Sequence, residues 1–296
     1  MNEPPTEPQA HAAQSPPRNQ GDPAIAAAAP VLRHLLVNDD RSLFSDEIVS
    51  RVRSMIAHVA AQLLFAQAEA AGVADSAAHI DTHQDELAAA LCADDALLLH
   101  VHARAVEGRV TEQLQRRSGI DPVLTPLVHD FVASKDAETA SRAMSLLAAQ
   151  TRFMQHYRRM ELPLRELPGE LFHTALLVFR SYGEADENSD EVEHRLRQGY
   201  DEATGRLALL TRLAMAAEGK SALRVDHAGV ALFVSALAQA VDQPRDLTVL
   251  ALTEGELPRL VARLRAAGLS PDELQAQLLH LHPDGEFLQP AEHSSR

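Results

Sequence analysis

Uninterrupted runs of strong helix formers constrain the fold of this chain more than any other feature of its sequence. The segment SDEIVSRVRSMIAHVAAQLLFAQAEAAG, residues 45–72, opens with a serine and two acidic residues and closes at a glycine. These residues match the capping and dipole preferences of the two ends of a helix. Aromatic residues make up only 4% of the chain, so little favours strands. The sequence therefore predicts an all-α fold, either a multi-helix bundle or irregular stacked helical hairpins.

Proline-rich and acidic stretches divide the chain into parts. A proline-rich segment with few bulky apolar side chains cannot offset the entropy of ordering, and an acidic run is expected to be solvated. Residues 190–218 and 226–242 each read as one continuous helical run. The expected parts are a disordered tail (1–23), a helical domain (24–183), an acidic loop (184–189), a C-terminal helical bundle (190–283) and a flexible tail (284–296).

Charge and cysteine content limit the partners and the compartment. The formal net charge of −15 repels nucleic-acid backbones and anionic lipid, so we expect no nucleic-acid partner. A single cysteine, Cys92, leaves no intramolecular disulfide, and the polar N-terminus lacks the pattern of a secretion signal. The longest apolar stretch, residues 227–241, is shorter than a bilayer requires. We therefore expect a bacterial cytoplasmic protein with no membrane span.

A histidine directly followed by an aspartate, His129-Asp130, is the pattern with which one class of phosphohydrolases binds a divalent metal. Such enzymes need a further histidine and a later aspartate, for which His100 and either Asp190 or Asp201 are the candidates. Histidine and aspartate are abundant in this chain, so one such doublet is expected by chance. The residues after the doublet also lack the glycine-containing turn of that class. We keep a metal-dependent phosphohydrolase as the alternative hypothesis.

Helical periodicity separates polar from apolar side chains between residues 95 and 117. His100, Arg104, Glu107 and Thr111 recur at helical spacing and form a polar stripe opposite an apolar one. An amphipathic surface helix has this pattern, so we expect the polar stripe to face solvent, and His100 with it.

Other local motifs carry little chemistry. His79 and His83 have the separation of zinc-binding helices, but Thr82 predicts a helix start that would leave His79 outside. The segment DENSD, residues 186–190, copies the first part of a calcium loop without its glycine or final glutamate. Cys92, on an alanine-leucine face, predicts inert packing. Glycine-rich nucleotide loops and serine-nucleophile elbows are absent from the sequence, so we expect no cofactor.

The segment RFMQHYRRM, residues 152–160, combines basic and aromatic side chains. Such a segment can bind an acidic partner surface or RNA. It also fits the positive end of a long helix whose aromatic residues pack inward, which we favour. If the segment binds a partner, we expect an acidic protein segment before nucleic acid. The candidate interaction residues are Arg152, His156, Arg158 and Arg159.

The C-terminal third, residues 227–275, contains Phe233, an Ala236-Leu237 step, a turn at Pro244 and a closing segment from Arg265 to Leu269. In this order of features it resembles all-helical alphaproteobacterial proteins of unknown function. The resemblance implies stacked helical repeats and a bacterial cytoplasm, and it implies no activity.

Long amphipathic helices with few gathered polar groups offer surfaces more than pockets. We therefore expect a non-catalytic interaction or regulatory protein, a scaffold or adaptor, that binds a protein partner or associates with itself. A binder of a small apolar ligand between helices fits the same sequence.

Overall fold

The structure is a computed structural model and describes residues 46–182, 189–253 and 257–283. Within these ranges the chain forms helices and turns and no strand, which confirms the all-α prediction. The expected tails, 1–23 and 284–296, lie outside the described residues. The helices are α3 (Asp46–Ala70), α4 (Ser76–Cys92), α5 (Asp95–Ser118), α6 (Pro126–Val132), α7 (Ala137–Arg158), η1 (Leu164–Glu166), α8 (Gly169–Tyr182), α9 (Ser189–Gln198), η2 (Glu202–Thr204), α10 (Arg206–Ala216), η3 (Ser221–Leu223), α11 (Val225–Ala240), α12 (Arg245–Leu250), α13 (Leu257–Ala266) and α14 (Pro271–Leu281).

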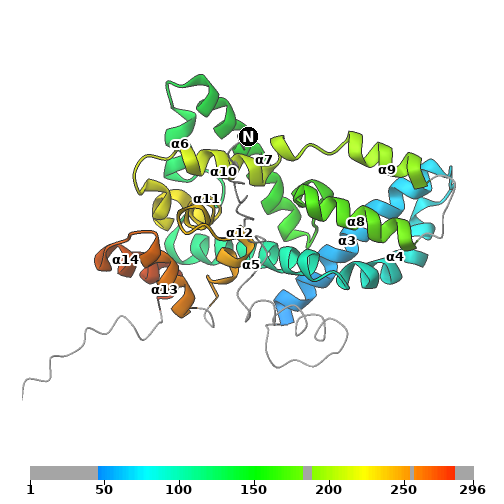
Figure 1. Ribbon diagram of the computed structural model, residues 1–296, viewed down its shortest axis with the longest axis horizontal. Helices are drawn as coiled ribbons and strands as arrows, with labels where there is room; N and C mark the ends of the chain where they lie inside the picture. The colour runs from blue at the N-terminus through cyan, green and yellow to red at the C-terminus, as the bar shows by residue number, and fades with distance from the viewer. Residues whose placement is uncertain (1–45, 183–188, 254–256, 284–296) are drawn as a thin grey trace, which may run out of the picture.

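Helix α5 is the central element of the fold. It packs against α3 and α4 from the start of the chain and against α11, α12 and α14 from its end (Figure 1). Buried apolar residues on both sides of the acidic segment 184–189 belong to one core, which extends from Ile48 to Leu281. Most of that acidic segment lies outside the described residues, and the domain boundary expected there stays a prediction.

Side-chain caps fix where several helices begin. Asp94, Thr125 and Asp136 each accept a hydrogen bond from a backbone N–H in the first turn of α5, α6 and α7. Ser270 and Glu273 form a capping box at the start of α14, as the sequence predicts. These helices therefore begin at residues that can be read from the sequence.

The predicted start of α4 is wrong. Asp75 caps the helix and its first residue is Ser76, so Thr82 lies inside it. The Thr82 hydroxyl instead donates a hydrogen bond to the backbone carbonyl of Ala78, one turn earlier. An earlier cap competes with Thr82 for the start, and a threonine can also satisfy its hydroxyl within a helix.

The run predicted as one helix over 190–218 is two helices, α9 and α10, with η2 between them. Gly199 and Gly205 lie in the break, and Gly205 directly precedes α10. Glycine costs about 1 kcal/mol relative to alanine inside a helix, which disfavours continuation through both positions. The break turns the chain so that α10 lies against α7 (Figure 1).

Helix α11 contains a kink at Gly229, which has φ 68° and ψ 169°. A β-carbon at this position would lie 2.5 Å from Cγ2 of Thr125, the cap of α6. This backbone conformation is essentially confined to glycine, and the close approach also requires the absence of a side chain. Gly229 therefore lets α11 pack directly on the start of α6.

Helix α3 is long and apolar enough to cross a membrane by length and composition, and α11 is apolar but shorter. Half of the apolar window in α3 is buried inside the fold, where Val52, Met55 and Val59 belong to the core. A core helix passes the same test as a membrane helix, so α3 is weak evidence for a span. The expected absence of a span stays a prediction.

Candidate functional site

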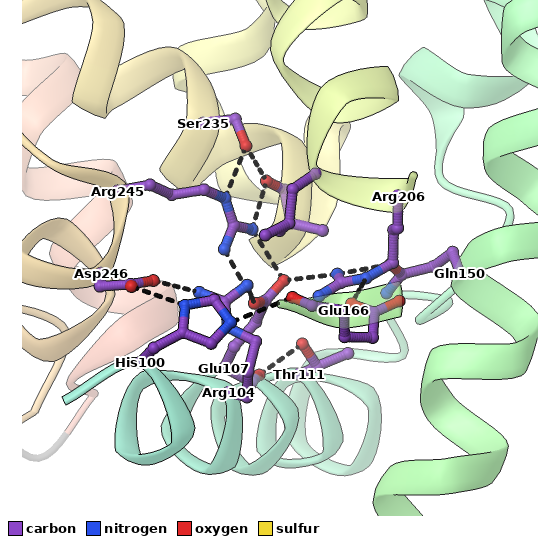
Figure 2. Close-up of polar contacts among 12 residues, drawn as sticks. His100, Arg104, Glu107, Thr111, Gln150, Glu166, Arg206, Ser235, Arg245 and Asp246 are labelled. Carbon is purple, nitrogen blue, oxygen red and sulfur yellow. Dashed lines mark hydrogen bonds and ion pairs between the residues drawn. The ribbon is translucent and has the colours of Figure 1, made fainter. Parts of the chain in front are cut away.

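The polar face of α5 lies in the interior of the protein, where it meets charged side chains from other segments (Figure 2). His100 is 1% exposed, Thr111 is 4% exposed, and Arg104 and Glu107 are fully buried. The prediction that this face is solvent-exposed is wrong. Because α5 is enclosed by helices from both ends of the chain, the charged residues of its polar stripe pair with charges from other segments. The hydroxyl of Thr111 donates to the backbone carbonyl of Glu107.

Glu107 is the centre of this buried network. Its carboxylate accepts hydrogen bonds from Nη1 of Arg206, at 2.9 Å, and from Nη1 and Nη2 of Arg245, at 2.9 and 2.8 Å. Nη1 of Arg104 lies 2.7 Å from its Oε2. Arg206 also donates to Glu166 in η1, at 2.8 Å, and to Gln150 in α7, at 3.1 Å. The network therefore joins α5, α7, η1, α10 and α12.

Charges within the network compensate one another. Burial alone raises the pKa of Glu107, but Arg104, Arg206 and Arg245 more than offset it and hold that pKa well below its usual range. Burial lowers the pKa of Arg206, but Glu107 and Glu166 raise it by more than burial lowers it. The net shift of this pKa is therefore upward. Glu107 and Arg206 therefore both stay ionised, as buried charges do only when they are paired.

His100 links three segments through its ring. Its Nδ1 lies 2.8 Å from Oδ2 of Asp246 in α12, and its Nε2 lies 3.0 Å from the carbonyl oxygen of Glu166. Burial raises the pKa of Asp246, but His100 and Arg104 lower it to about 2. Both ring nitrogens of His100 are therefore engaged in contacts with oxygen atoms.

The proposed metal ligands do not meet. His129 and Asp130 are exposed at 71% and 63%, with His129 Nδ1 3.8 Å from Asp130 Oδ1 and His227 Nε2 3.6 Å from Asp130 Oδ2. Asp190 accepts a hydrogen bond from Arg180 instead. In the described parts of the chain, no three His, Cys, Asp or Glu side chains form a group that could hold a metal ion. The phosphohydrolase hypothesis stays a prediction without a gathered ligand set.

His79 and His83 share one face of α4, which corrects the prediction that they do not. Their ring centroids are 4.8 Å apart, and burial together with His83 lowers the pKa of His79. His79 Nε2 lies 3.2 Å from Oε1 of Gln67 in α3, and His83 Nδ1 lies 3.3 Å from the hydroxyl of Tyr182 in α8. This pair therefore connects α4 to α3 and α8. Cys92 is half-buried and packs against the core.

A hollow of about 590 Å³ opens beside the buried network, between α7, η1, η2 and the start of α10. We call it the arginine hollow. It adjoins the network, because Glu166 and Arg206 belong to both. Its polar and charged lining residues are Arg142, Arg152, Arg165, Arg206, Arg212, His156, Glu166, Asp201, Ser141, Ser145 and Thr204.

Three of the lining arginines lack a carboxylate partner. Arg152 and Arg165 have neither a hydrogen bond nor an ion pair from their side chains within residues 46–182, 189–253 and 257–283. Nη1 of Arg212 donates to the carbonyl oxygen of Ala203, at 2.8 Å. The carboxylate of Asp201 is already occupied by hydrogen bonds from the backbone N–H of Ala203 and the hydroxyl of Thr204. The hollow therefore carries excess positive charge.

The structure separates the predicted interaction residues into two pairs. Arg152 and His156 line the arginine hollow, and His156 Nδ1 lies 2.7 Å from Oε2 of Glu161. Arg158 and Arg159 are exposed at the end of α7 and do not line it. Only the first pair therefore lies in a concave site.

The aromatic residues of the same segment pack inward, as predicted. Phe153 and Tyr157 are 2% and 1% exposed. The guanidinium of Arg206 lies 3.6 Å from the ring centroid of Phe153, and that of Arg51 lies 3.9 Å from the ring centroid of Tyr157. These cation–π contacts fix the inner side of α7 and leave its outer side to the hollow.

A second hollow of about 490 Å³ shares Arg165, Gly205 and Arg212 with the arginine hollow. Its surface is mostly apolar, and His100 and Asp246 of the buried network also reach it. The two hollows are therefore adjacent, one strongly basic and one mainly apolar. The apolar lining residues are Leu167, Pro168, Leu207, Ala208 and Pro244.

Sequence reasoning missed Arg165, Arg206 and Arg212, which share no local motif. The sequence contains a signal for the buried network but none for the hollow. Arg245 and Asp246 stand between two strongly apolar stretches, 225–241 and 247–252. Charges in such a setting are expected to be buried and paired. No pattern in the sequence indicates that η1 and α10 bring their arginines to α7.

The chain matches no protein-family model, no curated protein and no solved structure. The resemblance of residues 227–275 to alphaproteobacterial helical proteins stays a prediction. The chemistry of the arginine hollow is therefore the basis for a functional interpretation.

Proposed function

We propose that the chain is a non-catalytic interaction protein that binds an acidic segment of a partner protein in the arginine hollow. The observation that carries this proposal is the gathering of Arg152, Arg165 and Arg212, none of them paired with a described carboxylate, in one concave site. The chain as a whole has a net charge of −15. A surface this acidic repels acidic partners except where cations gather, so the hollow is the place where attraction exceeds repulsion.

The size and division of the site suit a peptide segment. Hollows of about 590 and 490 Å³ each fall in the range of ligand-binding clefts. A segment that crosses the shared residues Arg165 and Arg212 places acidic side chains in the arginine hollow and an apolar side chain in the second one. Arginine and apolar side chains in one cleft are also common at the centre of protein interfaces.

The state of the polar groups favours binding over catalysis. General acid–base chemistry needs a group that can accept or release a proton near the substrate. Both ring nitrogens of His100 are occupied, and Glu107 is held ionised by three arginines. Asp246, whose pKa is about 2, is bound by His100 and Arg104. The network therefore acts as a rigid support for the hollow.

The test uses a labelled peptide of alternating glutamate and leucine and measures its affinity by fluorescence anisotropy. Arg152→Glu is expected to weaken binding at least about tenfold, because it replaces attraction by repulsion inside the hollow. Arg159→Glu is the matched control: it makes the same charge change near the end of α7, outside the hollow. Equal losses in both variants would contradict the proposal, because they indicate a general charge effect.

Salt dependence and a peptide of opposite charge complete the test. Affinity for the glutamate peptide is expected to fall as ionic strength rises, since exposed charges are screened over about 10 Å at 0.1 M salt. A lysine-leucine peptide of the same length reports binding by the acidic surface or by apolar contacts alone. If it binds as tightly as the glutamate peptide, the arginine hollow is not the binding site.

A further inference from the structure

We infer that the anionic group bound in the arginine hollow is a phosphomonoester, an inference that rests on the proposed binding of an anionic segment there. The charge balance of the hollow is the first support. Arg142 pairs with Glu138, and Arg206 pairs with Glu107 and Glu166. The guanidinium groups of Arg152, Arg165 and Arg212 remain without a carboxylate partner in the described chain. The carboxylate of Asp201, which is bound only by neutral donors, offsets one of them and leaves about two positive charges. One carboxylate supplies a single negative charge, whereas a phosphomonoester supplies about 1.5 to 2 near neutral pH.

The start of α10 is the second support. Gly205 precedes this eleven-residue helix, and no side chain caps it. Gly205 and Arg206 both line the hollow, so the start of α10, with its positive dipole end, borders it. Backbone N–H groups at a helix start bind phosphate oxygens well.

Arg206 provides an observation independent of the helix end. Its side chain is fully buried, and its Nη2 has no hydrogen-bond partner within the described chain although Nε and Nη1 are both engaged. Arg206 is also a lining residue of the hollow. A buried guanidinium donor without an acceptor is costly, so the wall of the hollow at Arg206 favours an added anion beside it.

Hydroxyl groups add donors on the α7 side. Ser141 and Ser145 are four residues apart, so they lie on one face of α7, and both line the hollow. Together with the arginines and the start of α10, they surround the hollow with donors on several sides. A phosphoryl group has three oxygens that accept strongly, against two for a carboxylate, and therefore satisfies more of them.

The experiment compares three peptides that are identical except at one central position, which is phosphoserine, glutamate or serine. The peptides are acidic and contain leucine, and calorimetric titration measures each affinity against the full chain. We expect the phosphoserine peptide to bind at least about tenfold more tightly than the glutamate peptide. Equal affinities for these two overturn the phosphomonoester inference and leave the proposed function standing. If none of the three binds, the proposed function fails as well.

Variants locate the bound group. Arg165→Gln and Arg212→Gln are each expected to weaken binding of the phosphoserine peptide about tenfold. Binding of the serine peptide is expected to weaken much less. Arg117→Gln is the matched control, because Arg117 is an exposed arginine at the end of α5 outside the hollow. Arg165 is exposed, and its side chain makes no hydrogen bond or ion pair within the described residues, so its variant is expected to keep the thermal stability of the parent chain. Unchanged affinity in both hollow variants overturns the inference.

The source of the phosphomonoester is resolved by a further titration with free phosphoserine and with inorganic phosphate. Binding of the peptide at least about tenfold more tightly than the free amino acid assigns the group to a protein partner, since only the peptide also fills the second hollow. Equal binding of free phosphoserine supports a phosphomonoester site for a small molecule and overturns the protein partner. Equal binding of inorganic phosphate indicates an unspecific anion site and overturns the inference.

Discussion

Arg245 in α12 binds the carboxylate of Glu107 in α5 through two hydrogen bonds, of 2.8 and 2.9 Å, across 138 residues of sequence. Glu107 is fully buried and also binds Arg206, which reaches the arginine hollow. The pair therefore connects the centre of the fold with the wall of the candidate site. Bidentate geometry of this kind gives both strength and orientation.

Replacing Glu107 by glutamine is expected to destabilise the protein strongly. The amide keeps the size of the side chain but leaves Arg104, Arg206 and Arg245 without their common carboxylate. Breaking a buried ion pair from one side costs about 3–5 kcal/mol. The free energy of unfolding, measured by urea denaturation followed by circular dichroism, is expected to fall by about this amount.

Glu112→Gln is the control on the same helix. Glu112 is 24% exposed, and its only described ion pair, with Arg158, spans 3.8 Å. Such partly exposed pairs contribute less than about 1 kcal/mol. Comparable losses in the two glutamine variants would show that the buried network contributes no more to stability than a partly exposed ion pair.

Gly108→Ala is expected to destabilise α5 although alanine is the better helix former. A β-carbon at residue 108 would lie 2.1 Å from Cδ2 of Tyr157. Helix propensity favours the change by about 1 kcal/mol, but crowding in a packed core costs about 1–3 kcal/mol and the ring here has little room. A net loss in the free energy of unfolding is therefore expected.

The rescue of this variant tests the cause. In a Tyr157→Leu background the ring is absent, so adding Gly108→Ala is expected to be neutral or stabilising. Thermal denaturation of the two single variants and the double variant measures the coupling. An equal loss from Gly108→Ala in both backgrounds would rule out the contact with Tyr157 as its source.

Gly229→Ala is expected to be more damaging than Gly108→Ala, because two effects combine. The φ of 68° and ψ of 169° belong essentially to glycine, and the new β-carbon would lie 2.5 Å from Cγ2 of Thr125. Strain of about 1–3 kcal/mol from the backbone adds to the steric conflict. Thr125→Ser removes the methyl group and keeps the helix cap, so the double variant is expected to recover only the steric part. Full recovery would show that the backbone conformation carries no strain.

His102 is expected to make stability depend on pH. It is 5% exposed in α5, and burial lowers its pKa from 6.5 to about 4. Between these values the unfolded chain binds a proton that the folded chain does not, so the free energy of unfolding decreases as pH falls from 6.5 to 4. The loss reaches about 3 kcal/mol at the lower end.

Urea denaturation of the parent chain and of His102→Gln, each at about pH 7, 5.5 and 4.5, measures this contribution. The variant is expected to lose less stability over the interval, because glutamine does not titrate. Losses from the carboxylates follow at lower pH, since the pKa of Asp246 is held at about 2. Identical pH dependence in both proteins would contradict the assignment to His102.

The all-α fold class and several local features could be predicted from neighbouring residues, whereas the environment of one helix could not. The capping box at Ser270 and the inward packing of Phe153 and Tyr157 depend on neighbouring residues alone, and both are found. The polar stripe on α5 is compatible with a helix at the surface and equally with a helix buried against charged partners. Its partners, such as Arg206 and Arg245, lie about 100 to 140 residues away, so periodicity cannot reveal them.

The candidate site was predicted in part for the same reason. Arg152 and His156 share one helix, and their basic character is visible in one short segment. Arg165 and Arg212 belong to η1 and α10, and they reach the hollow only because the chain breaks at Gly205 and packs α10 against α7. A site assembled from separate short elements leaves no spacing to recognise.

The most direct measurement is nuclear magnetic resonance of arginine side-chain N–H groups, assigned by substitution, while an acidic leucine-containing peptide is added. If the peptide binds in the arginine hollow, the signals of Arg152, Arg165 and Arg212 shift together and saturate at one peptide per chain, while those of Arg158 and Arg159 stay in place. Shifts confined to Arg158 and Arg159, or small shifts spread over all exposed arginines, would contradict binding in the hollow.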